Sequence, residues 1–306
     1  MGLIGTGSNK GGRPAGMARR SLDLIDTMAL IAEPAQPITG RGIGYKLFSA
    51  GLIPSMGRAD MARVYRLLKL ARERDVIPWS WIVDETRGVE RISSWDDPEE
   101  FARAAATQYR LDFWTQQPGR CEVWSEKGTV RGVLKPVLDR YGVGFNPVHG
   151  FNSATNAYDA CASHDRRPLT VLYVGDYDPS GLCMSERDIP ARNEKYGGDH
   201  ITVKRIALTP EQLVGLPSFP ASDKRRDPRY RWFIENFDTD GQCWELDAMD
   251  PNELRECVEE NIRACIGDPD AWDRCELNTE AQRESLELVL SRWAKPEGSE
   301  DGRVDK

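Results

Sequence analysis

The sequence predicts an α/β chain in which a helical N-terminal part precedes a C-terminal part built on a parallel sheet. Two observations predict this class. Residues 21–75 contain three segments typical of short helices. From residue 120 onward, short apolar runs alternate with longer helical segments, and such alternation indicates parallel strands joined by crossover helices. A chain of 306 residues is long enough for two domains of ordinary size.

The composition argues against a transmembrane helix. Hydrophobic residues make up 40% of the chain and charged residues 29%, a globular balance. No run of eighteen apolar residues occurs, and the N-terminus is polar and rich in glycine, unlike a signal peptide. We therefore expect a cytoplasmic protein. Its seven cysteines form no CxxC pair, which argues against a zinc site.

Charge is distributed unevenly along the chain. The net charge of -8 argues mildly against DNA binding. However, residues 40–91 carry ten Lys or Arg against six acids, whereas residues 245–306 carry eighteen acids against eight bases. Affinity for nucleic acid depends on where positive charge clusters. The first half therefore remains able to contact phosphate.

The N-terminal part begins with a basic, glycine-rich stretch, residues 1–18, that we expect to form a mobile arm. A first helix is expected over residues 21–32, with Ser21 as N-cap and with Pro34 and Pro37 ending it. A second helix is expected from Thr39 or Gly40 to Phe48.

The third expected helix covers residues 58–75, with Asp60 as N-cap and Met61, Val64, Leu68 and Ala71 on one face. Residues 76–84 then indicate a short strand or a wing-like hairpin. Three short helices and a β element are the plan of a winged helix-turn-helix. We therefore assign residues 19–116 to a DNA-binding domain of that type, which includes a connecting helix over residues 97–114.

The C-terminal part, residues 117–295, is expected to be a Rossmann-like parallel sheet with a helical extension. Asp250-Pro251 begins the helix of that extension, and residues 296–306 are expected to be a disordered tail. The expected strands are residues 121–126, 143–150, 169–178 and 200–208, and the first helices between them are residues 128–142 and 153–165.

Acidic residues follow two of these strands. Glu126 ends the first strand, and Asp176 and Asp178 end the strand that begins at residue 169. Functional sites of parallel α/β sheets lie at the carboxyl ends of the strands, and residues two apart in an extended segment face the same side. Clustered carboxylates repel one another unless a cation lies among them. Their hard oxygens favour Mg²⁺, with Mn²⁺ as a substitute.

These motifs resemble a known family. S-E-K-G at residues 125–128, followed by D-Y-D-P-S-G at residues 176–181, resembles the Toprim domain. The form D-x-D-P-x-G is most similar to the A subunit of topoisomerase VI and to the related meiotic double-strand-break transesterase. T-G-R-G-I-G-Y at residues 39–45 resembles their T-x-R-x-I-x-Y segment, and residues 243–249 resemble a late E-x-E-A-L stretch. The resemblance covers roughly residues 20–290.

The resemblance implies Mg²⁺-dependent cleavage of double-stranded DNA by a nucleoid-associated homodimer. Tyr45 would be the nucleophile that becomes linked to the DNA 5′ end, and Arg41 would grip the scissile phosphate or assist activation of the phenol. Glu126, Asp176 and Asp178 of the other subunit would hold the ion. A full strand-passage cycle would need a separate ATPase subunit of the B type. The candidate contacts to the DNA backbone are Lys46, Arg58, Arg63, Arg66 and Arg72.

Several alternatives stay open. One reason is a departure from the family pattern: the family usually has larger residues where this chain has Gly42 and Gly44. Tyr45 could be a buried helix aromatic, in which case the chain would be a Toprim nuclease that uses water. Alternatively, the acid site could be inactive and the chain a DNA-binding module. Glu122 is the alternative ligand to Glu126, and the basic face of residues 58–74 could simply be solvated.

Overall fold

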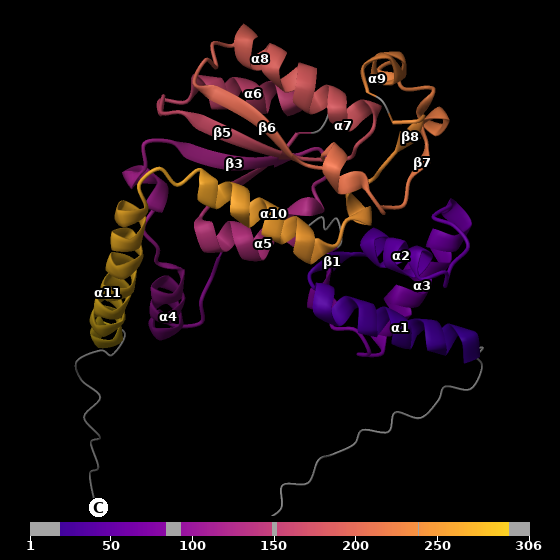
Figure 1. Cartoon of the computed structure of the whole chain (residues 1–306). Coiled ribbons are helices and arrows are strands. Elements are labelled where there is room, and N and C mark those ends of the chain that lie inside the picture. Colours follow the sequence, from indigo (N-terminus) through magenta and orange to yellow (C-terminus); the bar gives the residue numbers. More distant parts are fainter. Residues whose placement is uncertain (1–18, 84–92, 149–151, 238, 294–306) are drawn as a thin grey trace, which may run out of the picture. The chain divides into compact units, whose positions relative to one another are not determined.

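The computed structural model describes residues 19–83, 93–148, 152–237 and 239–293 (Figure 1). The chain divides into two compact units, residues 1–83 and 84–306. The expected N-terminal arm, the expected C-terminal tail and the segment 149–151 lie outside the described residues.

The first unit is helical, with one short pair of parallel strands. Ile38 pairs with Ile82 and Thr39 with Val83. Its elements are α1 (Arg19–Ala35), β1 (Ile38–Thr39), α2 (Gly40–Ser49), α3 (Arg58–Glu73), a 3₁₀ turn (Trp79–Trp81) and β2 (Ile82–Val83).

The core of the first unit is formed by one apolar face from each of its helices. On α3 the buried residues are Met61, Val64, Leu67, Leu68 and Ala71, so the predicted apolar face is confirmed. The three- and four-residue spacing brings these side chains to one side of the helix. They pack against buried residues of α1 and α2, and this burial from water stabilises the unit.

The ends of two predicted helices differ from the expectation. Helix α1 begins at Arg19, so Ser21 is not its N-cap, and Pro34 lies inside its last turn. Helix α3 is capped by Gly57 rather than by Asp60. The Asp60 carboxylate instead accepts a hydrogen bond from the Ser55 hydroxyl over 2.6 Å.

The β element predicted at residues 76–84 is shorter than expected. Trp79–Trp81 forms a 3₁₀ turn after Pro78, and only Ile82–Val83 is a strand. Because proline lacks a backbone donor, it favours the start of such a turn over a paired strand. Within residues 76–83 the structure has a parallel pairing with β1 and no hairpin.

The second unit contains a four-stranded sheet in the order β4-β3-β5-β6. All its pairings are parallel, which confirms the predicted parallel α/β class. In Figure 1, α5 and α10 lie on one face of this sheet and α6 and α8 on the other. The strands are β3 (Arg120–Ser125), β4 (Gly144–Pro147), β5 (Leu169–Val174) and β6 (Ile201–Ala207). The helices around them are α5 (Val130–Tyr141), α6 (Asn152–Ala162), α7 (Pro179–Cys183), α8 (Ile189–Lys195) and α10 (Pro251–Ala264).

The central position of β5 explains its continuous apolar sequence. It pairs with β3 on one side and β6 on the other, and five of its six residues are buried. Strands covered on both faces need apolar side chains at every position rather than at alternate ones. The register places Trp124 of β3 opposite Tyr173 of β5, so both strands end at the same edge of the sheet.

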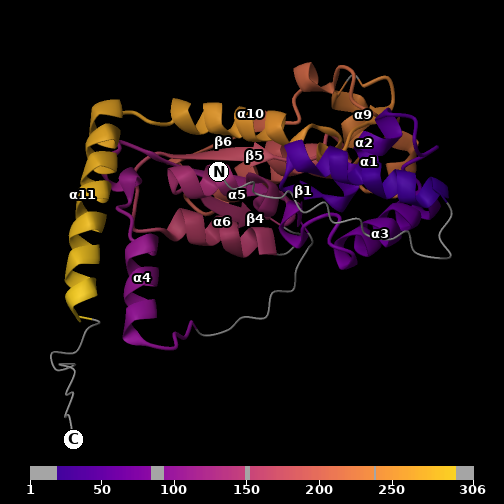
Figure 2. The same ribbon diagram turned by 90° about the horizontal axis from the view of Figure 1, so that it is seen from below.

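Helices α4 (Pro98–Gln108) and α11 (Pro269–Trp293) run side by side in the second unit (Figure 2). The Arg283 guanidinium donates to the Tyr109 carbonyl over 2.9 Å. The compact units therefore divide after Val83, before α4, whereas the sequence predicted a domain boundary at residues 116–117. The partner of α4 lies far along the chain, so local patterns could not reveal it.

A 3₁₀ turn (Phe113–Gln116) precedes β3, and further short elements follow β5 and β6. They are a π turn (Met184–Asp188), a 3₁₀ turn (Pro210–Leu213), β7 (Phe219–Pro220), a 3₁₀ turn (Ala221–Lys224), α9 (Tyr230–Asn236), β8 (Gln242–Cys243) and a 3₁₀ turn (Leu246–Ala248). Strands β7 and β8 are antiparallel. Among the helices in the described ranges, none has the length and apolarity needed to cross a bilayer.

Candidate functional site

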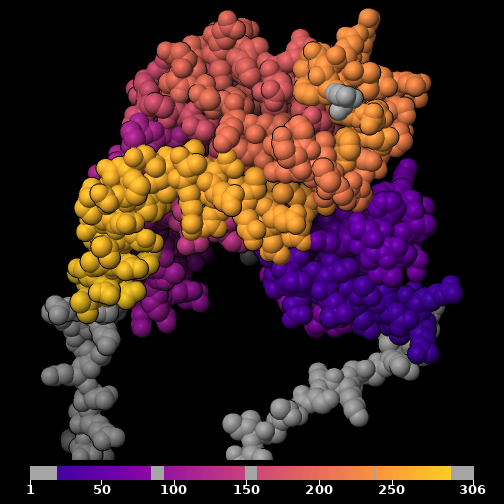
Figure 3. All heavy atoms as spheres, in the orientation of Figure 1, coloured from indigo at the N-terminus to yellow at the C-terminus, as the bar shows by residue number. Residues whose placement is uncertain are grey.

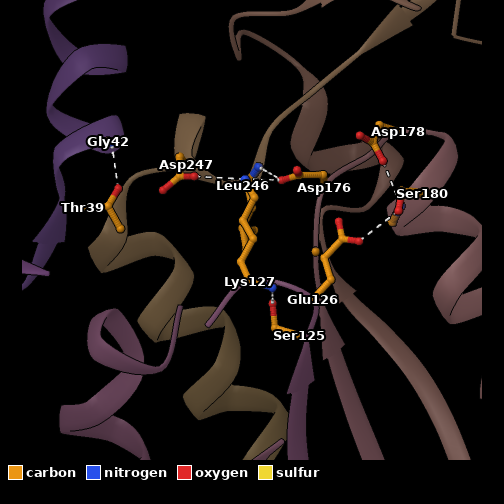
Figure 4. A network of polar contacts seen from close by, with 12 residues as sticks. Thr39, Gly42, Ser125, Glu126, Lys127, Asp176, Asp178, Ser180, Leu246 and Asp247 are labelled. Atoms are coloured by element: carbon orange, nitrogen blue, oxygen red, sulfur yellow. Dashed lines mark hydrogen bonds and ion pairs between the residues drawn. The ribbon is translucent and has the colours of Figure 1, made fainter. Parts of the chain in front are cut away.

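The structure brings Glu126, Asp176 and Asp178 together at the carboxyl ends of β3 and β5 (Figure 4). Asp178 is the N-cap of α7, and its Oδ1 accepts the Gly181 N–H over 2.8 Å. In the same first turn of α7, the Ser180 hydroxyl donates to Glu126 Oε2 over 3.2 Å. Helix α7 thus connects Glu126, which follows β3, to the aspartates that follow β5.

Burial and mutual repulsion govern the charge of this acid cluster. Asp176 and Asp178 are buried, with exposed fractions of 6% and 2%. Burial, together with the nearby charges of Asp176 and Asp178, raises the pKa of Glu126 to about 7. Burial likewise raises the pKa of Asp176. Additional positive charge would therefore stabilise the ionised cluster.

Two glycines, Gly175 and Gly181, allow close packing in the acid loop. A Cβ at residue 181 would overlap the carbonyl oxygen of Asp176. A Cβ at residue 175 would lie 2.7 Å from the Tyr173 ring. Neither glycine has a positive φ, so the absence of a side chain, rather than backbone freedom, is what these positions require.

Two lysines that the sequence analysis did not single out contact the acids. Lys127 Nζ lies 2.7 Å from Asp176 Oδ1 and 3.0 Å from Asp247 Oδ2. Lys224 Nζ lies 3.0 Å from Asp178 Oδ2. Burial alone would lower the pKa of Lys127, but Asp176 and Asp247 outweigh it and raise that pKa. Only the position of Lys127 beside Glu126 could have suggested its role.

The segment at residues 243–249, noted for its resemblance to a late family motif, packs on the acid loop. Its Leu246 N–H donates to Asp176 Oδ1 over 2.7 Å. The backbones of Tyr177 and Trp244 exchange two hydrogen bonds of 2.9 and 3.0 Å. The late segment therefore fixes the loop that carries the two aspartates.

Arg205 of β6 supports the same loop from the other side. Its guanidinium donates to the carbonyl oxygens of Gly175 and Asp176 at 3.0 and 3.2 Å. It also donates to the Ser185 hydroxyl over 3.0 Å and lies over the Tyr173 ring. Nothing in the local sequence distinguishes this arginine, because its partners come from distant residues.

The chemistry of the acid cluster fits a divalent cation. Three carboxylates supply the hard oxygens that Mg²⁺ prefers, and burial, together with the charges of Asp176 and Asp178, raises the pKa of Glu126 and so disfavours its ionised form. In the described part of the chain, however, no three His, Cys, Asp or Glu side chains form a ready-made metal cage. Glu126, Asp176 and Asp178 would be the residues that hold the ion.

Glu122, the alternative to Glu126, is engaged elsewhere. Its Oε2 accepts the Trp124 indole N–H over 2.8 Å, and its Oε1 lies 3.9 Å from Arg120. The charges that raise the pKa of Glu126 come from Asp176 and Asp178. The geometry therefore favours Glu126 as the third acid.

Tyr45 and Arg41 lie in the first unit, on α2. Tyr45 is only 5% exposed, and the Arg41 guanidinium lies 5.7 Å from the centre of its ring. The flanking glycines permit close packing: a Cβ at residue 44 would lie 2.5 Å from Met61 Sδ, and one at residue 40 would lie 2.9 Å from the Tyr65 ring. Gly40 and Gly44 thus allow α2 to approach α3, whereas a Cβ at residue 42 would meet Ile38 and Thr39.

The predicted DNA-contact residues fall into two groups. Arg58, Arg63 and Arg66 are exposed on α3, away from its buried face. Arg72 and Lys46 are half-buried, and the Arg72 guanidinium lies 4.2 Å from the Trp79 ring. The first group is accessible to a phosphate backbone, whereas Arg72 also has a packing role.

The class of protein that the fold and site define is a two-unit α/β chain with a carboxylate cluster at the end of a parallel sheet. Comparison with protein-family models matched none of them, and comparison with curated proteins found no significant relative.

Proposed function

We propose that this chain cleaves DNA in a Mg²⁺-dependent reaction, as the A subunit of topoisomerase VI does. The observation that carries the proposal is the meeting of Glu126, Asp176 and Asp178 at adjacent ends of β3 and β5. In this proposal the first unit is a winged helix that binds double-stranded DNA, and the parallel sheet is a Toprim domain. A homodimer and a separate ATPase subunit of the B type belong to the same proposal.

The residues of the cluster would hold the ion and keep it in place. Glu126, Asp176 and Asp178 supply oxygens from two strands, while the Leu246 N–H holds the Asp176 carboxylate and Arg205 holds the Asp176 backbone carbonyl. The bound Mg²⁺ would supply positive charge to stabilise the phosphate during displacement. Such a cluster is typical of phosphodiester chemistry because the phosphate develops negative charge as the bond breaks.

Tyr45 is the proposed nucleophile. Its hydroxyl oxygen would attack phosphorus, and the deoxyribose oxygen would leave as a free 3′-hydroxyl while Tyr45 stays joined to the 5′ phosphate. Arg41 lies one helical turn earlier beside the Tyr45 ring, so its guanidinium is suited to hold the phosphate oxygens. The exposed arginines of α3 would grip the adjacent backbone.

Trapping a covalent adduct tests this proposal. The protein is incubated with end-labelled duplex DNA and Mg²⁺, denatured, and run on a gel. We expect a protein–DNA adduct in wild type that disappears in Tyr45→Phe and in Asp176→Ala. DNA that is bound but never cut, with Mg²⁺ or with Mn²⁺, would leave only a DNA-binding module.

The burial of Tyr45 favours a second candidate function, a Toprim nuclease that uses water. A tyrosine only 5% exposed has to become accessible before it can attack DNA. In the nuclease, Tyr45 would be a core residue, and the acid cluster alone would support hydrolysis. Cleavage without an adduct, retained in Tyr45→Phe and lost in Asp176→Ala, would establish this alternative.

A further inference from the structure

The two lysines at the acid cluster differ in how firmly they are held. Lys127 bridges the carboxylates of Asp176 and Asp247, and its side chain is 23% exposed. Lys224 contacts one carboxylate within the described residues, that of Asp178, and its side chain is 39% exposed. An ammonium shared by two carboxylates and largely shielded from water costs more to remove than a more exposed ammonium paired with a single carboxylate.

Lys127 is also fixed by its position in the chain. It directly follows Glu126, and its backbone N–H donates to the Ser125 hydroxyl over 3.1 Å. Its second partner, Asp247, directly follows Leu246, whose N–H binds Asp176. Lys127 therefore belongs to the framework that joins the late segment to the acid loop.

Lys224 comes instead from the surface of the second unit. It ends the 3₁₀ turn Ala221–Lys224, and residues 225 and 226, which follow it, are exposed. In Figure 3, residues in this part of the chain, coloured orange, lie at the surface. The other oxygen of Asp178, Oδ1, is bound to the Gly181 N–H. Oδ2, the oxygen that Lys224 contacts, would become available if this side chain turned outward.

We propose that Lys224 is a displaceable internal cation, which neutralises Asp178 in the metal-free protein and leaves when a divalent ion binds. The inference rests on the proposed function, because it concerns the same metal site. An ammonium and a divalent cation compete for the same oxygen and repel each other at that distance. Lys224 thereby sets the affinity of the site and prevents the acids from remaining uncompensated.

Release of Lys224 would also couple metal binding at the acid cluster to the binding of DNA phosphates. The freed ammonium would lie next to Arg225 and Arg226 in the sequence, whose exposed side chains carry the same charge. Three adjacent cations suit a phosphate backbone. Metal binding would therefore strengthen the binding of a polyanion at this segment, and by linkage the polyanion would strengthen metal binding equally.

Metal affinity without DNA tests the proposal directly. Mn²⁺ binding to the full chain is measured by electron paramagnetic resonance in wild type, Lys224→Met, Lys224→Arg and Arg231→Met. Lys224→Met keeps the length of the side chain and removes its charge, so we expect about fivefold tighter binding, the size of a partly exposed ion pair. Lys224→Arg should bind as wild type does.

Arg231→Met is the matched control, because it removes an equal charge from a residue that pairs with Glu235. It should leave the Mn²⁺ affinity nearly unchanged. Unchanged or weaker binding in Lys224→Met, with wild type binding Mn²⁺, overturns the proposal but leaves the metal site standing. Absence of Mn²⁺ binding in wild type overturns the metal site itself, and the proposal with it.

Chemical labelling gives a second readout that does not depend on a substitution. Acetic anhydride acetylates exposed amines, and mass spectrometry measures the extent at each lysine. Saturating Mn²⁺ should increase the labelling of Lys224, while the labelling of Lys127, which is held between Asp176 and Asp247, and of the exposed Lys195 stays constant. Equal labelling of Lys224 with and without Mn²⁺, in a protein that binds the ion, contradicts its displacement.

Discussion

The backbone N–H of Leu246 donates a 2.7 Å hydrogen bond to the carboxylate of Asp176, seventy residues earlier in the chain. The adjacent Asp247 accepts from Lys127, which itself contacts Asp176. The late segment, the loop after β5 and the residue after Glu126 thus form one buried polar network. We therefore expect changes in this network to alter the stability of the folded protein.

Loss of the Lys127 charge should destabilise the protein strongly. Lys127→Met leaves Asp176 and Asp247 without their shared cation, and an unpaired buried charge costs about 3 kcal/mol. Urea unfolding with a chelator present measures the change. Lys135→Met is the control, because Lys135 pairs with Asp139 at the surface with more than 60% of each side chain exposed. A similar change in both variants would contradict a structural role for Lys127.

Gly181→Ala should destabilise the acid loop far more than alanine at an unconstrained glycine. The new methyl group would overlap the Asp176 carbonyl oxygen, so the backbone has to shift, at a cost of about 2 kcal/mol or more. At Gly144 the nearest atom to a new Cβ is 3.7 Å away, so Gly144→Ala is the control. Thermal unfolding of the two variants measures the difference, and equal melting temperatures would show that the loop is not closely packed.

The stability of the metal-free protein should depend on pH through Glu126. Burial and the neighbouring aspartates raise the pKa of this carboxyl from 4.5 to about 7, so the folded state binds the proton more tightly than the unfolded state. The Glu126 contribution to stability is fully present below pH 4.5 and is lost as the pH rises to about 7.

Comparison with Glu126→Gln isolates this effect, since glutamine stays neutral throughout. The measured quantity is the unfolding free energy of Glu126→Gln minus that of wild type, with a chelator present. This difference should increase by about 3 kcal/mol as the pH rises from 4.5 to 7.5. Parallel profiles for the two proteins would mean that Glu126 ionises normally and lies outside the repulsive cluster.

The exposed arginines of α3 should contribute to DNA affinity through phosphate contacts. Arg63→Gln and Arg66→Gln should each weaken binding and reduce the slope of log affinity against log salt by about 0.9. Arg103→Gln, which removes an exposed arginine from α4, should leave the slope unchanged. Fluorescence anisotropy across a salt series measures it. Equal slopes in all variants would indicate that the α3 face is merely solvated.

Much of the fold followed from local sequence patterns. The apolar run of β5 and the helical spacing of α3 are properties of neighbouring residues, so the sequence could show them. Parallel pairing follows from the alternation of strands and helices. This parallel pairing also places Glu126, Asp176 and Asp178 at one edge of the sheet.

The sequence could not show partners that meet only in the folded chain. Lys224 reaches Asp178 from a segment without a motif, and Arg205 acts through carbonyl groups that any residue provides. The predicted N-cap of α3 was wrong because the helix begins at Arg58, which places Asp60 inside the first turn, where its carboxylate accepts from Ser55. Lys127 stands in the S-E-K-G motif, but its contact with Asp247 joins residues far apart in the chain, so the sequence could not show its role.

The central claim is that Glu126, Asp176 and Asp178 hold one divalent ion. Crystals of the full chain soaked in Mn²⁺ test it most directly through anomalous diffraction. We predict a single strong peak at about 2.0–2.3 Å from a carboxylate oxygen of each of the three acids, as hard oxygen ligands require. An anomalous peak at another place in the molecule would contradict the account. So would the absence of a peak at these three acids, with Lys224 still in contact with Asp178.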